Sequence, residues 1–453
     1  MSRGRVVVVG GGLAGVTAAL DLAEAGFAVE LLETRSRLGG ATYSFQRGDL
    51  VVDTGQHVFL RCYTAYTDLL RRIGARDRIS MQRRFRVPVL SPNGRASLLH
   101  RWNLPAPGHL LPVLLDYRQL TAAQRARVAR TSLALRMLDP ADPALDEISL
   151  GEWLRQHGES PRAVAALWGM LGLAALNADP DDASMLLAAK VFRTGVLDRS
   201  DSADIAIPQA PLAQLHGDAA HRALLAAGAG VRVRCRARAI RRAGADFHVF
   251  AKEGGNSREF SADSVVLAVP HQAAAGLLAD LPVPGTATWA GLSAAPIVNV
   301  HLHYDRQVTG LRMAAVLDSP VQWVFDRTAI SGATHGQYLA LSLSAAQEYV
   351  DQRTEDLRAL FVPAVQQLFP RAREARLLDF FVTREPRATF RQAPGTAAIR
   401  PDARTPVPGL VLAGAWTGTG WPDTTEGAVR SGARAAEVVA ADLRERHGVE
   451  VTA

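Results

Sequence analysis

The sequence predicts an α/β fold with two domains, one of which is assembled from three separated pieces of the chain. A strand, a glycine-rich turn, a helix and a second strand follow one another over residues 5–34, an order typical of a βαβ unit. Strand patterns return over 230–269, and a last strand at 410–413 leads into a helix expected over 425–444. The first domain is therefore predicted to combine residues 1–62, 208–270 and 405–453.

The two stretches between these pieces carry different patterns and are predicted to form the second domain. Residues 63–207 read mainly as helices broken by proline, among them 122–138 and 163–176. Residues 271–404 alternate apolar and polar side chains, as over 297–303, which is typical of a mixed sheet. We expect this sheet to lie under a pocket, so that the second part is a mixed-sheet and helical substrate domain.

Composition indicates an ordinary globular protein and excludes several functions. Of its 453 residues, 48% are hydrophobic and 21% charged, so the chain can bury a large core. Cys62 and Cys235 are the only cysteines, which leaves neither a disulfide framework nor the ligand spacing of a structural zinc site. No metal is therefore expected.

The charge distribution argues against a polyanionic partner. The net charge is +7, but the basic residues are nearly all Arg, with Lys only at Lys190 and Lys252, and they are scattered among acidic residues. Without a basic run or interleaved aromatics, no nucleic-acid partner is predicted. No segment has the roughly 18 uninterrupted apolar residues that cross a bilayer, and the few residues before the first strand are too short for a signal peptide. We expect a cytoplasmic protein whose membrane contact is at most peripheral.

The first turn of the chain carries a dinucleotide fingerprint. It reads Gly-Gly-Gly-Leu-Ala-Gly between an apolar strand and an Ala-rich helix, the setting that makes G-x-G-x-x-G informative for a Rossmann-like domain. The first glycine permits a tight turn, the second lets the backbone approach a pyrophosphate, and the third lets helix and strand pack closely. The helix N-terminus presents free N–H groups to the anion. We assign Gly10, Gly12, Leu13, Ala14 and Gly15 to this site.

Glu33 closes the second strand of this unit. A carboxylate at this point accepts hydrogen bonds from the adenosine ribose hydroxyls and repels a 2′-phosphate, so FAD or NAD is favoured over NADP. The fingerprint by itself does not separate FAD from NAD.

The segment after Glu33 resembles that of the amine-oxidase and phytoene-desaturase superfamily, whose members bind FAD. It reads Glu-Thr-Arg-Ser-Arg-Leu-Gly-Gly. The resemblance implies that Arg35 and Arg37 help to hold the phosphates and that Gly39 and Gly40 bring the chain against the cofactor. Ala41 departs from the pattern, because many members carry another Arg there.

Two later segments extend the resemblance to FAD-binding proteins. Ala237 follows the strand near residue 231, where these families bind adenine through backbone groups. The C-terminal segment resembles their flavin motif, which implies roles for Gly414, Trp421, Thr424 and Thr425 and places a helix N-terminus against the flavin pyrimidine. Trp416 and Trp421 are candidates for an apolar wall beside the flavin, and packing in the core is the alternative for both. Ala415 departs from the Asp or Glu usual there, and since no Cys follows Cys235, bound FAD is expected to be non-covalent.

The segment Asp53-Thr54-Gly55-Gln56-His57-Val58-Phe59, with the C-terminal segment, most resembles the squalene-associated hydroxysqualene dehydroxylases. The resemblance implies a long apolar isoprenoid substrate, whose allylic hydroxyl is replaced by hydride from reduced FAD to give squalene. Gly55 and Gln56 are expected beside the flavin. His57 is the candidate acid, because its ordinary titration range suits proton donation near neutral pH. A histidine that only orients Gln56 is the alternative, and Asp53 is expected to cap the turn.

Residues 98–115 have a composition suited to a membrane interface, with Trp102, several Leu, three prolines and the flanking Arg101 and Arg118. Packing into the domain core is the alternative for the same residues. The sequence leaves the oligomeric state open.

Three other functions remain open from the sequence. An amine oxidase shares the flavin motifs, although many members use a Lys in the second substrate segment and this chain has none after Lys252. A carotenoid-type desaturase shares the fold and an apolar substrate. A catalytically degenerate FAD-binding protein would fit the departures at Ala41 and Ala415.

Overall fold

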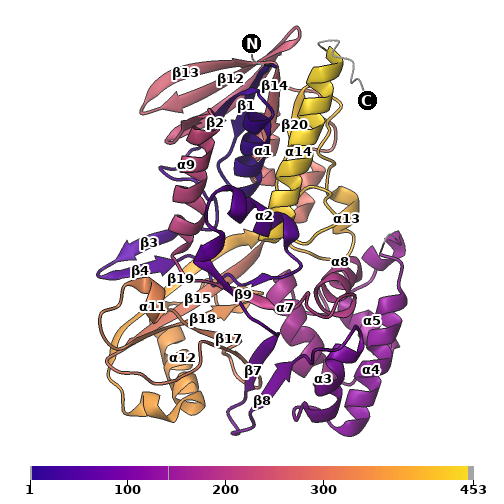
Figure 1. Ribbon diagram of the computed structural model, residues 1–453, viewed down its shortest axis with the longest axis vertical. Helices are drawn as coiled ribbons and strands as arrows, with labels where there is room; N and C mark the ends of the chain where they lie inside the picture. Colours follow the sequence, from indigo (N-terminus) through magenta and orange to yellow (C-terminus); the bar gives the residue numbers. More distant parts are fainter. Residues whose placement is uncertain (1–2, 141, 447–453) are drawn as a thin grey trace.

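Five parallel strands form the central sheet of the upper part of the molecule (Figure 1). The computed structural model describes residues 3–140 and 142–446. In sheet order the strands are β10 (Gly230–Arg232), β2 (Ala28–Leu32), β1 (Arg5–Val9), β14 (Ser264–Leu267) and β20 (Leu410–Leu412). They come from all three pieces assigned to the first domain, whose detailed boundaries stay a prediction. In open parallel sheets, ligands bind beyond the carboxyl ends of the strands.

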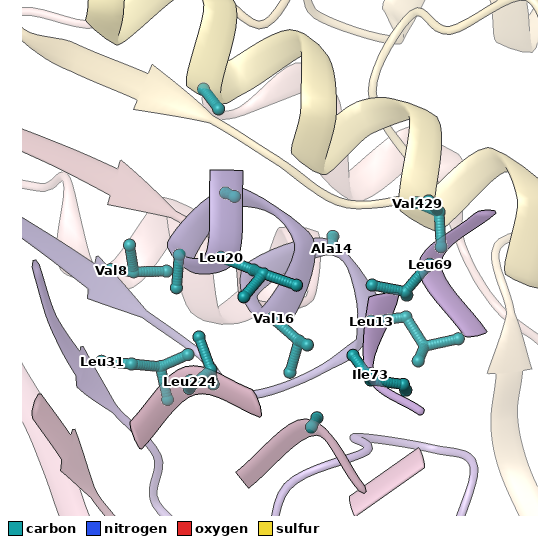
Figure 2. Close-up of a cluster of buried hydrophobic side chains, with 14 of the residues drawn as sticks. Val8, Leu13, Ala14, Val16, Leu20, Leu31, Leu69, Ile73, Leu224 and Val429 are labelled. Carbon is teal, nitrogen blue, oxygen red and sulfur yellow. The ribbon is translucent and has the colours of Figure 1, made fainter. Parts of the chain in front are cut away.

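Helix α1 (Leu13–Glu24) packs between this sheet and the long C-terminal helix α14 (Thr425–Arg446). The helices approach closely at Gly432, where a Cβ atom would lie 2.2 Å from the carbonyl oxygen of Ala14. Figure 2 shows the resulting core, in which side chains from strands, α1 and α9 (Ala219–Ala226) meet. This packing fixes the start of α1 and the start of α14 on the same side of the sheet.

A three-stranded antiparallel sheet extends the upper part. It consists of β11 (Cys235–Ala243), β12 (Asp246–Glu253) and β13 (Asn256–Ala262). Its first strand is joined to the end of β2, because the N–H of Cys235 donates to the carbonyl of Glu33 at 2.9 Å and that of Arg234 donates to Arg35 at 2.8 Å.

A seven-stranded mixed sheet is the centre of the lower part. Its strands are β19 (Leu377–Thr389), β15 (Ala295–Tyr304), β18 (Gln337–Leu343), β17 (Trp323–Asp326), β16 (Met313–Val316), β7 (Arg86–Leu90) and β8 (Ser97–His100). Helix α12 (Thr354–Leu368) covers one face of the sheet.

The hairpin β7–β8 is an unexpected feature of residues 63–207, which are otherwise mainly helical, as the sequence predicts. It adds to the sheet of the second insertion, with β7 parallel to β16. Its buried Val87 and Val89 alternate with less buried neighbours over only five residues, a pattern too short to stand out among helices. The two insertions therefore share one sheet and one wall of the cavity described below.

Short strands connect the two parts of the molecule. One pair is β3 (Ser44–Arg47) with β4 (Leu50–Asp53), and a three-stranded set joins β5 (Phe59–Leu60), β9 (Ile205–Pro208) and β6 (Ile79–Met81).

Helix α2 (Thr64–Arg72) packs against α14 in the upper part of the molecule. Other helices of the first insertion gather beside the mixed sheet (Figure 1). They are α3 (Leu111–Asp116), α4 (Ala122–Met137), α5 (Leu150–Gln156), α7 (Met170–Leu176) and α8 (Met185–Phe192). Helix α4 begins at a capping box. The Thr121 side chain accepts from the N–H of Gln124, and the Gln124 side chain accepts from the N–H of Thr121. Across residues 3–140 and 142–446, no helix is both long and apolar enough to cross a membrane.

Candidate functional site

One cavity of about 600 Å³ extends from the carboxyl edge of the parallel sheet into the helical insertion. At its upper end lie Leu13, Gly39 and Thr425, and at its lower end lie Leu111 of α3 and Leu133 of α4. Most of its lining is apolar, with contributions from α7, α8 and the mixed sheet. The cavity therefore connects the predicted cofactor segments to the surface helices of the second part.

The glycine turn has the geometry that a dinucleotide requires. Gly10 has φ +109°, and a Cβ there would lie 2.2 Å from the carbonyl oxygen of Ala268. A Cβ at Gly15 would lie 1.9 Å from the carbonyl oxygen of Gly10. Gly12 is the N-cap of α1, and Leu13 and Ala14 open the helix, so the first N–H groups of α1 are directed out of the sheet edge.

Glu33 is held by the backbone on both sides. Its Oε2 accepts from the N–H of Gly11 at 2.7 Å and its Oε1 accepts from the N–H of Arg35 at 2.6 Å. Each carboxylate oxygen can accept a second hydrogen bond, so the carboxylate is oriented for ribose hydroxyls while it also braces the glycine turn. The sequence did not indicate this bracing role.

The segment around residues 39 and 40 packs directly on the glycine turn. Gly39 (φ +98°) donates its N–H to the carbonyl of Gly11 at 2.8 Å, and a Cβ at Gly40 (φ +59°) would lie 2.9 Å from the Cα of Gly12. The backbone of residues 39–40 therefore packs against the backbone of the glycine turn beside the start of α1, and only glycines allow so close an approach.

Two arginines follow Glu33 at the edge of the same site. The Arg37 guanidinium lies 3.3 Å from the centroid of the Tyr43 ring and donates to the carbonyl of Gly40 at 3.0 Å. Burial, with the like charge of Arg35, lowers the pKa of Arg37. Glu385, on β19, lines the cavity nearby, and burial raises its pKa against the opposing influence of both arginines. A cluster of two cations therefore faces a partly buried carboxyl group.

The C-terminal segment supplies a helix N-terminus to the cavity. Gly414 (φ +139°) donates its N–H to Ser431 Oγ at 2.8 Å. Thr424 caps α14, because its Oγ1 accepts from the N–H of Gly427 at 3.1 Å. Thr424 and Thr425 both line the cavity, as the C-terminal motif indicated.

Two buried polar atoms at this end of the cavity have no partner within the described part of the chain. They are Oγ1 of Thr425 and Oε1 of Gln56, and both residues line the cavity, as does Gly55. Buried polar groups are normally hydrogen-bonded. A flavin ring, whose edge carries donors and acceptors, would satisfy such atoms, so the residues present fit FAD.

The structure does not bring every expected residue to the cavity. Trp421 and Trp416 are absent from its lining in the described chain. Trp421 lies between the cations of Lys190 and Arg430, at 4.8 and 4.9 Å from its ring centroid, and Trp416 donates its indole N–H to the carbonyl of Val269. The described contacts fit packing in the core, and Trp421 also contacts the ring of Tyr63, which lines the cavity. A place for either ring beside the flavin stays a prediction.

Ala237 lies at the other end of the dinucleotide site. It sits at a bulge of β11, between Ala237 and Ala239 in the pairing with β12. Because β11 begins on the carbonyls of Glu33 and Arg35, the backbone of Ala237 is near the ribose carboxylate and far from the apolar cavity. This placement is compatible with an adenine contact, which stays a prediction.

His57 lines the cavity, but its titration differs from the expectation. Burial lowers its pKa to about 4, with Asp53 raising it and Arg327 lowering it. The ring is therefore neutral at pH 7, and it can offer an N–H hydrogen bond but not an imidazolium proton. No hydrogen bond to Gln56 forms in the described chain, so the orienting role is not what the geometry shows.

Asp423 is a cavity residue that sequence reasoning missed. Its Oδ2 accepts from the N–H of Phe390 at 2.9 Å, and burial raises the carboxyl pKa to about 6 in spite of the Phe390 hydrogen bond and the charge of Arg400. The sequence feature that could have indicated its role is an acidic residue within the C-terminal motif, two residues before the start of α14. Only the fold shows that this acid faces an apolar cavity.

Arg400 organises the loop that leads to Asp423. Its Nη2 donates to the carbonyls of Ala415 at 3.0 Å and Trp421 at 2.9 Å, and also to that of Thr417. Burial lowers the pKa of Arg400 to about 10, so the guanidinium stays charged.

A dinucleotide cradle at the edge of a parallel sheet, opening into a cavity with unsatisfied polar atoms at the start of α14, defines an FAD-dependent oxidoreductase. The flavin containing amine oxidoreductase family matches residues 13–440, and the chain belongs to this family.

Known proteins similar to the chain fall into two groups. It is 32% identical to a hydroxysqualene dehydroxylase of Rhodopseudomonas palustris, over 96% of this chain and 98% of that protein. It is 27% identical to a probable zeta-carotene desaturase of Synechococcus elongatus, over 96% and 98%. Among solved structures, an oxidoreductase from Methanosarcina mazei has a TM-score of 0.74 at 18% identity, covering 96% of this chain and 100% of the other. That last likeness supports the fold alone.

Proposed function

We propose that this chain catalyses the reductive dehydroxylation of hydroxysqualene, which yields squalene and water. The observation that carries the proposal is the long apolar cavity, which joins the flavin segments to the α3 and α4 helices. Such a cavity suits an isoprenoid with one hydroxyl group better than a polar substrate. The 32% identity to a protein named for this reaction supports the same choice.

FAD, when bound in its reduced form, supplies the hydride. The chain must supply the rest. Its apolar lining, including Trp168 and Phe192, excludes water around the breaking C–O bond. The departing oxygen needs a proton or a strong hydrogen bond, because hydroxide is a poor leaving group.

Two side chains on the cavity wall are candidates for this proton. Asp423 carries a raised pKa of about 6, so a fraction of its carboxyl groups is protonated at neutral pH. His57, with a pKa of about 4, is neutral there and offers an N–H hydrogen bond to the oxygen. We propose Asp423 as the proton donor and His57 as a hydrogen-bonding group at the same wall.

The test is anaerobic incubation of the dithionite-reduced holoprotein with hydroxysqualene, followed by product analysis. Squalene formed in amounts that match flavin oxidation supports the proposal. Unchanged hydroxysqualene, together with oxidation of a carotene precursor by the oxidised enzyme, assigns the chain to the desaturase reaction instead. A colourless protein that cannot be reconstituted with FAD shows the degenerate alternative.

An amine substrate is disfavoured by the lining of the cavity. Many amine oxidases use a Lys in the second substrate segment, but this chain has no Lys after Lys252. Its two lysines, Lys190 and Lys252, are both outside the cavity lining.

Hydroxysqualene and squalene are almost wholly apolar. We therefore propose that they pass between the cavity and a lipid phase, through a peripheral contact of the protein with a membrane.

A further inference from the structure

Exposed apolar side chains are concentrated in one region of the described chain. Nine large apolar residues are exposed, and six of them fall within 102–137. These six are Trp102, Leu104, Leu111, Leu115, Leu133 and Met137, with exposed fractions from 38% to 85%. A concentration of this kind marks an interaction surface, whereas single exposed apolar residues are normal.

Four of the six residues lie on two adjacent helices, Leu111 and Leu115 on α3 and Leu133 and Met137 on α4 (Figure 1). Trp102 and Leu104 lie in the segment before α3. On α4, the exposed residues Ala126, Arg130, Leu133 and Met137 are spaced by four, three and four positions, so they lie on one face of the helix. On α3, Leu111 and Leu115 are exposed at the spacing of one turn. We call the surface formed by the six apolar residues and Arg130 the α3–α4 face.

The cavity opens along this face. Leu111 and Leu133 are both exposed and both line the cavity, one from each helix. A ligand leaving the flavin segments along the apolar lining would therefore emerge between α3 and α4. The same two side chains belong to the interior wall of the cavity and to the outer surface of the protein. An apolar ligand could therefore move between the cavity and a lipid phase without passing through water.

The charge of the face is positive. Helix α4 contains four arginines and no acidic residue, and Arg130 and Arg136 form no ion pair within residues 3–140 and 142–446. Nearby acidic residues include Asp116, which lies 3.8 Å from Arg118, and Asp139, just beyond the end of α4. Asp198 and Asp201 line a polar pocket together with Asn103 and Ala106, beside the segment that carries Trp102 and Leu104. An apolar surface edged by unpaired arginines complements anionic lipid headgroups.

Arg101 does not contribute to this surface, contrary to its expected place at a membrane interface. Its Nε donates to Asp204 Oδ1 at 2.7 Å and its Nη2 to Oδ2 at 2.9 Å, and the side chain is only 6% exposed. Arg101 therefore holds the segment before α3 against the segment before β9.

We propose that the α3–α4 face docks on a bilayer containing anionic phospholipid, with the cavity mouth opening into the acyl-chain region. Leu115 and Met137 insert among the lipids and Arg130 contacts the headgroups. What passes through the mouth rests on the proposed function, but docking itself does not. No part of the protein spans the bilayer in this arrangement.

The test is sedimentation of the FAD-loaded protein with vesicles in the absence of substrate. Vesicles of phosphatidylcholine with phosphatidylglycerol are compared with vesicles of phosphatidylcholine alone. The double variant Leu115→Glu/Met137→Glu changes two exposed residues outside the cavity lining and is expected to lower vesicle affinity at least tenfold. Arg130→Gln is expected to lower it about fivefold, and only with phosphatidylglycerol present.

The matched control is Leu225→Glu on α9, because Leu225 is 55% exposed, close to the 61% of Leu115. Its vesicle affinity should equal that of the unsubstituted protein. Turnover of detergent-dispersed hydroxysqualene by the double variant should be unchanged, which separates docking from catalysis.

Two results would overturn the proposal. One is equal sedimentation of the double variant and the control with anionic vesicles. The other is a stable dimer of the unsubstituted protein that the double variant converts to a monomer, since the face would then be covered by a second copy. Failure of the dehydroxylation reaction with intact vesicle binding would count against the proposed function alone.

Discussion

Arg327 and Asp53 form a buried ion pair although they are 274 positions apart in the chain. Their side chains are 5% and 4% exposed. Asp53 also accepts from the N–H of Leu212 at 3.0 Å and from the hydroxyl of Ser44. The carboxylate thus joins the end of β4, the segment before α9 and the second insertion. It does more than cap a local turn, and it lies close enough to His57 to influence its pKa.

Removing one member of this pair should be costly. Arg327→Met leaves an uncompensated buried carboxylate and is expected to lower the free energy of unfolding of the holoprotein by about 3 to 5 kcal/mol. The double variant Asp53→Asn/Arg327→Met should recover part of the loss, because no charge then remains unpaired. Denaturant titration followed by circular dichroism measures both. Arg434→Gln, in an exposed pair with Glu437, serves as the control and should leave stability unchanged.

Buried histidines make stability depend on pH. Burial lowers the pKa of His57 to about 4 and those of His216 and His301 to about 3, from 6.5. Each folded-state pKa lies below the unfolded value, so the unfolded chain takes up protons first and stability is lost as pH falls from about 6.5 towards 4.

We expect a loss on the order of 1 to 2 kcal/mol for each histidine between pH 7 and pH 5. His301→Gln should reduce the pH dependence of stability in proportion, since the buried ring of His301 is hydrogen-bonded to the Tyr338 hydroxyl and stacks on Phe381. The exposed His335, changed to Gln, should retain the original dependence. The free energy of unfolding is measured at several pH values by denaturant titration. An equal change with pH in the His301→Gln and His335→Gln variants would contradict this account.

Asp423 should control the pH profile of turnover. With a pKa of about 6, its protonated fraction falls as pH rises above 6, so single-turnover squalene formation should decline on that side. Asp423→Asn is expected to lower the rate about 10²- to 10⁴-fold, as for loss of a general acid, and to remove the pH dependence. His57→Gln retains a hydrogen-bond donor and should lose much less activity. A decline above pH 6 that persists in Asp423→Asn would exclude this carboxyl as the donor.

Arg400 should hold the flavin loop in place. Arg400→Met removes the donor to three loop carbonyls, and we expect FAD to dissociate at least tenfold more readily, equivalent to about 1.4 kcal/mol. The increase of flavin fluorescence on release measures this. Arg391→Gln removes an exposed ion pair to Asp182 and is the control. Equal retention by both variants would show that the loop does not depend on Arg400.

The dinucleotide half of the site was accessible from local sequence because its chemistry depends on neighbouring residues. Gly10, Gly12 and Gly15 are required by the geometry of one turn, and Glu33 is fixed by the end of one strand. Their positions follow from strand and helix periodicity over about 30 residues. The bounds of α4 also agreed closely with the expected 122–138, and β15 contains the alternating stretch 297–303.

The apolar half of the site depended on contacts between distant segments. Nothing near residue 101 indicated that Arg101 pairs with Asp204, and nothing near residue 423 indicated that Asp423 is surrounded by apolar walls. The rings of Trp416 and Trp421 looked suited to a flavin, but neither lines the cavity in the described chain, so this role stays a prediction. Exposure and pKa are properties of the assembled fold, so local patterns could not supply them.

The sequence alone determined the βαβ unit, because this unit depends on residue types at short spacing. FAD and an apolar substrate were implied by the resemblance of its motifs to a known superfamily. Tertiary structure decided which side chains face the cavity, that burial raises the pKa of the Asp423 carboxyl group, and where the cavity reaches the surface. The physical reason is that desolvation and long-range pairing exist only once segments hundreds of residues apart, such as Asp53 and Arg327, are packed together.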